Sequence, residues 1–143
     1  MSEDPHDLQR FLDAQDAGGT YERALAELRA GRKTSHWMWF VFPQVAGLGQ
    51  SAMSRRYAIA SPAEARAYLE HPVLGPRLVE SARALLAHGE LSAEEILGGI
   101  DAVKLRSSMT LFAAASPEEP VFAEVLDRFY DGRRDPATER LLG

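Results

Sequence analysis

The sequence predicts a mainly α-helical protein, folded as a single compact domain of about seven helices over residues 1–143. Apolar residues recur through most of the chain at the three- and four-residue spacing of amphipathic helices. Proline stands at the expected first helical position of several of these stretches, where its missing N–H is harmless. The length of 143 residues, with 45% hydrophobic and 26% charged residues, fits one globular domain.

Two helices are expected at the beginning of the chain. Asp4 precedes a proline, and the apolar residues of 8–15 keep helical spacing up to a pair of glycines. Thr20 is expected to cap the second helix, which covers 21–28 and ends at Gly31, because glycine readily adopts the left-handed conformation that closes a helix.

The next stretch, residues 36–44, has the sequence HWMWFVFPQ and contains both tryptophans. Its apolar side chains would face both sides of either a helix or a strand, so periodicity leaves its conformation open. Pro43 favours an extended Phe42. The glycine-containing residues from Pro43 to Ser54 predict a loop.

Capping signals and apolar stripes alternate through the rest of the chain. Ser61 and Ser92 are each followed three residues later by glutamate, the pattern of a capping box. We expect a short turn at 92–97 and five further helices, over 61–69, 75–86, 101–112, 116–130 and 135–142.

Composition limits the possible functions. The chain has no cysteine, and its four histidines lack metal-ligand spacing, so we expect no bound metal and no cofactor. The net charge of −5 opposes binding to nucleic acid, in spite of the arginine pairs at 55–56 and 133–134. No apolar run is long enough for a bilayer, and the first residues are acidic, so we expect a cytoplasmic protein without a membrane partner.

Lysine is rare in this chain, which contains fourteen arginines and only Lys33 and Lys104. A lysine can lose its proton when buried and is the smaller donor, so it can be required where arginine would fail. Chance survival of two lysines is an equally acceptable interpretation.

Both lysines lie in or next to the segments that combine polar with aromatic or large apolar residues, 36–44 and 101–112. Lys33 and His36 precede Trp37 and Trp39, and Gln44 follows them. Aromatic side chains beside cationic donors suit a nucleobase or ribose joined to phosphate. The alternative is that these aromatic residues are simply core.

The second segment is predicted to be a helix with Asp101, Lys104, Ser107 and Ser108 on one face. Such a face can form the wall of a pocket. It also contains the residue types of a Ser-Lys dyad, in which a desolvated lysine accepts the proton of a serine nucleophile. The alternative has Asp101 as helix cap, Lys104 as its surface ion-pair partner, and both serines bonding back to the helix backbone.

Four runs of sequence are distinctive: Asp7-Leu8-x-Arg10-Phe11-x-x-Ala14-Gln15, Gly31-x-Lys33-x-x-His36-Trp37-Met38-Trp39-Phe40-x-Phe42-Pro43-Gln44, Ala67-Tyr68-Leu69-x-His71, and Lys104-Leu105-x-Ser107-Ser108-Met109-Thr110-Leu111-Phe112. Together they resemble the bacterial domain-of-unknown-function family 1810, which automatic annotation sometimes mislabels calpastatin. The resemblance covers about residues 7–142. It implies a small, mostly helical cytosolic protein without an established activity.

The order of an Ala-Gln helix, a lysine segment and a later Met-x-x-Phe helix is also similar, more weakly, to the NADAR or YbiA-like group. This second resemblance implies action on ADP-ribosyl or ribosyl-amine compounds. Asp101 or Glu27 would then supply a carboxylate, and Lys33 or Lys104 would hold phosphate or the opened sugar. The chain lacks a clear match to the glutamate at the start of that group's helix motif.

The leading hypothesis is a pocket between the two lysine segments that binds a nucleotide or ADP-ribose-like anionic metabolite. Hydrolysis of that metabolite by an N-glycosidase reaction is left open. The candidate catalytic residues are Lys33, His36, Asp101 and Lys104, and the candidate substrate-binding residues are Trp37, Trp39, Gln44, Ser107 and Ser108. The alternative is a non-catalytic protein-interaction module with an aromatic core, in which the helical stripe at 122–130, or another helical stripe, serves a partner or a second copy. The chain would be a monomer or a homodimer.

Overall fold

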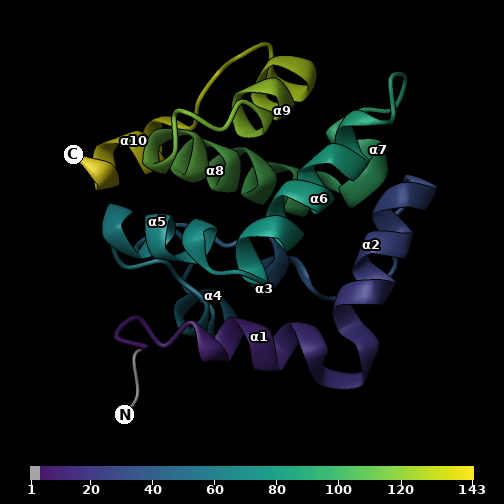
Figure 1. The fold of residues 1–143 in the computed structure, drawn as a ribbon. Helices are drawn as coiled ribbons and strands as arrows, with labels where there is room; N and C mark the ends of the chain where they lie inside the picture. The colour runs from purple at the N-terminus through teal and green to yellow at the C-terminus, as the bar shows by residue number, and fades with distance from the viewer. Residues whose placement is uncertain (1–3) are drawn as a thin grey trace.

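The structure, a computed structural model, describes residues 4–143, and helices follow one another along most of this range (Figure 1). The helices are α1 (Gln9–Asp16), α2 (Thr20–Ala30), α3 (Met38–Val41), α4 (Ala52–Arg56), α5 (Pro62–Glu70), α6 (Leu74–Leu86), α7 (Ala93–Leu97), α8 (Gly99–Ala115), α9 (Val121–Tyr130) and α10 (Pro136–Leu142), with a 3-10 turn η1 (Ala17–Gly19) between the first two. Within residues 4–143, β pairing is limited to one isolated parallel bridge, Val45 to Ile59. The prediction of a mainly helical fold is confirmed.

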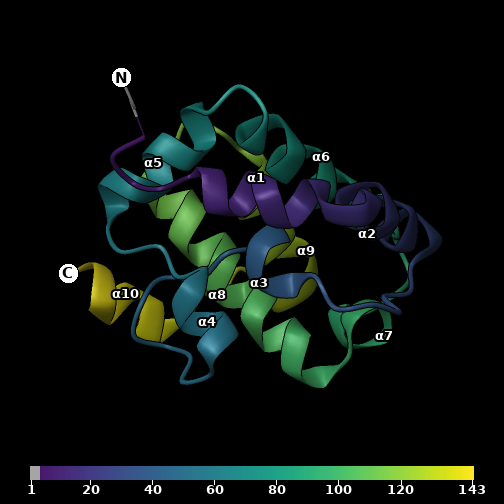
Figure 2. The same ribbon diagram turned by 90° about the horizontal axis from the view of Figure 1, so that it is seen from below.

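Helix α8 is the longest helix, and it packs against α5, α7, α9 and α10 (Figures 1 and 2). Its residues Leu105, Met109 and Phe112, expected on one face, are fully buried. Phe112 packs against Phe122 of α9, with ring centroids 5.8 Å apart. No helix within residues 4–143 combines the length and the apolar character that a membrane span requires.

Helix α9 uses its apolar stripe inside the protein. Val121, Phe122, Val125 and Leu126 are buried in the core. The suggestion that the 122–130 stripe serves a partner is therefore wrong for most of its length, because α6 and α8 already cover it.

The stretch 36–44 contains one helical turn, α3, after which Phe42 leaves the helical region with φ −125° and ψ 75°. Trp37, Phe40 and Phe42 are buried in the core. The interpretation of this stretch as core is confirmed for these residues, whereas Trp39 stays partly exposed.

Three predicted helix starts are wrong. Thr20 is the first residue of α2 and does not cap it, because Gly19 stands at the N-cap position. Helix α9 begins at Val121 rather than 116, because α8 continues to Ala115 and the Ser116 amide still donates to the Phe112 carbonyl. Helix α8 begins at Gly99, so Asp101 lies inside the first turn instead of capping the helix. The short helix α4 also lies where the sequence predicts loop up to Ser54.

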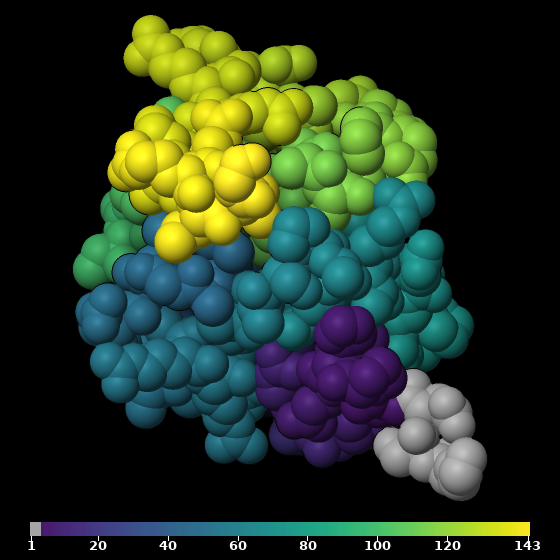
Figure 3. Space-filling model, turned by 90° about the vertical axis from the view of Figure 1, so that its left-hand side faces the viewer, coloured from purple at the N-terminus to yellow at the C-terminus, as the bar shows by residue number. Residues whose placement is uncertain are grey.

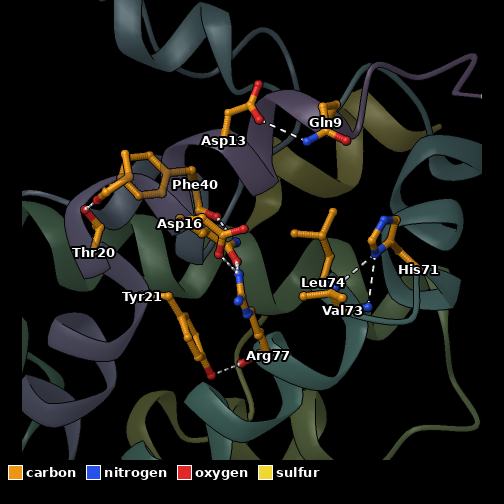
Figure 4. Close-up of polar contacts among 12 residues, drawn as sticks. Gln9, Asp13, Asp16, Thr20, Tyr21, Phe40, His71, Val73, Leu74 and Arg77 are labelled. Atoms are coloured by element: carbon orange, nitrogen blue, oxygen red, sulfur yellow. Dashed lines mark hydrogen bonds and ion pairs between the residues drawn. The ribbon is translucent and has the colours of Figure 1, made fainter.

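Polar side chains join α1, α3 and α6 inside the protein. Gln15 donates to the Phe40 carbonyl at 2.7 Å and accepts from Arg77 at 3.1 Å. Arg77 also pairs with Asp16 at 2.9 Å, and the Tyr21 hydroxyl donates to the Arg77 carbonyl (Figure 4). These bonds fix the α3 turn against its neighbours, because buried polar groups are costly unless paired.

Glu27 of α2 binds the chain that precedes α3. Its carboxylate accepts from the Thr34 amide at 2.9 Å, from the Ser35 amide at 3.1 Å and hydroxyl at 2.6 Å, and from the Trp37 indole at 2.8 Å. Burial alone would raise the pKa of Glu27. The hydrogen bonds from Ser35, Thr34 and Trp37 outweigh burial and lower the pKa to about 2.

We predict that Glu27→Gln lowers the free energy of unfolding by roughly 2 to 3 kcal/mol at pH 7, because the amide cannot accept every N–H that faces it. The folded pKa of about 2 lies below the ordinary 4.5, so folding favours the ionised carboxylate. The stabilisation is complete above pH 4.5 and decreases as the pH falls towards 2. Urea unfolding at pH 7 and at lower pH measures this difference.

The matched control is Glu22→Gln, an exposed glutamate on the same helix, for which we expect a change below about 0.5 kcal/mol. Equal effects of the two substitutions, or a Glu27→Gln difference that is constant with pH, would contradict this role of Glu27.

Candidate functional site

One carboxylate brings the two lysines together. Lys33 Nζ lies 2.8 Å from Asp101 Oδ2, and Lys104 Nζ lies 3.6 Å from Asp101 Oδ1. The exposed fractions of the side chains are 9% for Lys33, 17% for Asp101 and 22% for Lys104. Two segments about seventy residues apart in sequence therefore share a partly buried cluster of charge, which we call the lysine cluster.

Backbone contacts hold both sides of the lysine cluster in place. The Lys33 amide donates to the Ile96 carbonyl of α7 at 2.7 Å. On the other side, the Tyr130 hydroxyl of α9 donates to the Ala102 carbonyl in the first turns of α8. Because Asp101 precedes Ala102, this bond fixes the turn that carries the carboxylate.

Each ammonium group lies over an indole. The Lys33 and Lys104 nitrogens are 5.1 Å from the ring centroids of Trp37 and Trp39 respectively, within the range of cation–π attraction. Trp37 is fully buried, so no face of its indole is available to stack on a ligand. Trp39 is partly exposed beneath Lys104.

An open groove of about 450 Å³ lies beside the lysine cluster, lined by α8, the start of α10 and the chain from Gln44 to Ser54. Figure 2 shows that α8, α10 and α4 lie near one another. Its lining residues come from three separate segments: Gln44, Leu48, Gly49, Ser54, Ile100, Val103, Lys104, Ser107, Asp135 and Ala137. Gln44, Lys104 and Ser107 are three of the residues predicted from the sequence. The volume is within the usual range of small-molecule sites.

Asp135 is a groove residue that sequence reasoning missed. Its Oδ2 accepts from the Ser107 hydroxyl at 3.1 Å and from the Thr138 amide at 3.0 Å, so it also caps α10. Ser107 additionally donates to the Val103 carbonyl at 3.3 Å. The Asp-Pro sequence indicates a helix cap, but nothing local shows that α10 packs against Ser107.

Several predicted site residues lie outside the groove. His36 is exposed and makes no hydrogen bond or ion pair with the described part of the chain. Ser108 is fully buried, and its hydroxyl has no partner among residues 4–143. Within the same range, Lys104 makes no hydrogen bond to Ser107 or Ser108, so the structure contains no Ser-Lys dyad.

A smaller hollow of about 240 Å³ adjoins the groove and shares Gln44, Gly49 and Ser54 with it. Arg55 of α4 also lines this hollow. Figure 3 shows α10 lying directly against the segment of residues 40–60, and a Cβ added at Gly47 would lie 3.3 Å from Leu141 Cδ2.

A larger hollow of about 700 Å³ lies elsewhere, along α6. It contains none of the predicted site residues. Its arginines Arg29 and Arg83 share the lining with Glu80 and Glu119, and Arg29 already lies 3.6 Å from Glu80. We therefore place the candidate site in the groove, where the chemistry-bearing residues gather.

The described residues, 4–143, contain no group of three histidine, aspartate or glutamate side chains able to hold a metal ion. The groups that offer charge or hydrogen bonds in the groove are the side chains of Lys104, Gln44, Ser54, Ser107 and Asp135.

Comparison with known proteins agrees with the fold. A conserved hypothetical protein from Mycobacterium tuberculosis, Rv1873, has a crystal structure that matches with a TM-score of 0.94 and 50% sequence identity. The match covers 97% of this chain and 98% of that protein. No curated protein matches the chain. The family model described as protein of unknown function DUF1810 matches residues 5–142, and the chain therefore belongs to the DUF1810 family.

Proposed function

We propose that the protein binds a small anionic metabolite of the nucleotide class in the groove. The observation that supports this proposal most directly is that Lys104, Gln44 and Ser107, from separate parts of the chain, line one hollow of about 450 Å³. An ammonium, an amide and a hydroxyl beside an apolar wall are the groups that recognise a polar ring joined to an anion.

Lys104 is the cation that the groove itself offers to a ligand. Lys33 holds Asp101 at hydrogen-bond distance, whereas the Lys104 nitrogen is 3.6 Å from the same carboxylate. Lys104 can therefore turn towards a ligand oxygen while Asp101 keeps its ion pair with Lys33. Lys33 does not line the groove, so we assign it a positioning role.

The other groove residues suit the uncharged part of such a ligand. The Gln44 side chain offers a donor and an acceptor, and neither is used by another described residue. Leu48, Ile100 and Val103 provide the apolar wall. The groove thus has polar groups on one side and a surface for a ring on the other.

The proposal is limited to binding. Both oxygens of Asp101 already face ammonium groups, and the exposed His36 does not line the groove. Hydrolysis of an N-glycosidic bond needs an acid or base that faces the substrate. Asp135 is the carboxylate in the groove, and it is engaged as the cap of α10.

We predict that adenosine monophosphate or ADP-ribose stabilises the protein, and that Lys104→Ala weakens binding about tenfold, which corresponds to about 1.4 kcal/mol. A ligand at ten times its dissociation constant adds about 1.4 kcal/mol to the free energy of unfolding. Thermal unfolding detects this stabilisation, and titration calorimetry measures the affinity.

The control variant is Arg32→Ala, which removes an equal charge from an exposed residue outside the groove. It should bind like the wild type. Equal losses in both variants, or no stabilisation by either compound at millimolar concentration, would contradict the proposal. Product analysis of the same samples shows whether the bound compound is hydrolysed.

A second candidate function, a protein-interaction module, is favoured by the exposed apolar side chains at the rim of the groove. Ile100 is 77% exposed and Val103 is 64% exposed, both on the first turns of α8. Neighbouring exposed apolar residues of this size are typical of a contact surface. The occupant to test is a second copy of the chain, because isologous dimers are the commonest oligomers.

This second candidate predicts a dimer at micromolar concentration by light scattering, and conversion to a monomer by Ile100→Asp. The control is Leu141→Asp, which places the same charge at another exposed apolar position, on α10. A monomeric wild type, or a dimer that survives Ile100→Asp, would exclude a dimer formed through this face.

A further inference from the structure

We propose that the ligand extends from the groove into the smaller hollow, where Arg55 binds a phosphate-type anion. The rest of the ligand then occupies the groove, where the Lys104 ammonium donates to its polar oxygens. This inference rests on the proposed function and narrows it, because it assigns a separate subsite to the anionic group. It names a nucleoside monophosphate as the ligand class.

The two hollows are adjacent parts of one surface depression. Gln44, Gly49 and Ser54 line both of them. Their volumes are about 450 and 240 Å³, so the second adds room for a small group at one end of the first. A ligand that touches Ser54 from the groove is already at the entrance of the smaller hollow.

The groove and the smaller hollow differ in the charges of the residues that line them. In the groove, Lys104 is accompanied by Asp135, so the lining contains one cation and one anion. In the smaller hollow, Arg55 alone is charged among the described residues that line it. An anionic group gains more there, because no carboxylate repels it.

Arg55 has no carboxylate partner within residues 4–143. Its Nη2 donates to the neutral Oε1 of Gln50 at 3.2 Å, and its other guanidinium donors make no hydrogen bond to the described residues. A guanidinium presents several donors in a planar fork that matches the oxygens of a phosphate. Arg55 is therefore free to bind the anion through two of them.

Besides Arg55, Ser54 supplies a hydrogen-bond donor where the groove meets the smaller hollow. The Ser51 hydroxyl donates to the Ser54 hydroxyl at 2.9 Å, which leaves the Ser54 hydrogen free for a ligand oxygen. Gly49 passes so close that a Cβ at position 49 would lie 2.4 Å from both Cβ and Oγ of Ser54. A side chain at position 49 would therefore displace Ser54 and fill part of the entrance.

The test compares adenosine monophosphate, adenosine and inorganic phosphate by titration calorimetry. For the wild type we expect the monophosphate to bind at least tenfold more tightly than adenosine or phosphate. Arg55→Gln should reduce the affinity for the monophosphate to about that for adenosine, and leave adenosine binding unchanged. Gly49→Ala should weaken both, because it moves Ser54.

The matched control is Arg56→Gln, the neighbouring exposed arginine of α4, which does not line the hollow. It should keep the wild-type preference for the monophosphate. A wild type that binds adenosine as tightly as the monophosphate, or a preference that Arg55→Gln leaves intact, overturns the subsite. If the subsite is overturned in this way but Lys104→Ala still weakens binding, the proposal of ligand binding in the groove stands. If none of the three compounds binds the wild type, both the subsite and the groove proposal are overturned. Phosphate binding as tightly as the monophosphate overturns the extended ligand.

Discussion

The organisation of the site depends on the Asp101 carboxylate. Lys33 approaches one of its oxygens from the chain between α2 and α3, and Lys104 approaches the other from one turn further along α8. A partly buried carboxylate needs such partners, because an unpaired charge in this position is costly. Two cations around one anion leave an excess positive charge beside the groove. The ion pairs thus join two distant segments and supply the charge that the proposed ligand requires.

The rest of the fold keeps that carboxylate and its partners in position. Glu27 holds the chain before α3 through four hydrogen bonds, and the buried Trp37 is part of the same contact. Helix α8 lies at the centre of the packing, and Tyr130 holds its first turns. Rigid support of this kind lowers the cost of ordering side chains when a ligand binds. The flanking loop and α4, by contrast, provide Gln44 and Ser54 respectively to the lining of the groove.

Local signals in the sequence predict much of this fold, and contacts between distant segments explain what they miss. The capping box at Ser92 and the buried face of Leu105 and Met109 follow from spacing within one helix, and the structure has both. Periodicity cannot distinguish Trp37, inside the core, from Trp39, because both have apolar neighbours. Asp135 reaches the groove only through the packing of α10 on α8, and the sequence shows its role as a helix cap alone.

The most direct measurement of ligand binding in the groove is a titration of the ¹⁵N-labelled protein with adenosine monophosphate, followed by nuclear magnetic resonance. We expect shifted amide signals to gather on residues 44–55, on the first half of α8 and at Asp135, with the Gln44 side-chain amide among them. Shifts that gather instead around Arg83 and Glu119, which line the larger hollow, would contradict binding in the groove. A spectrum that does not change at millimolar ligand would contradict it equally.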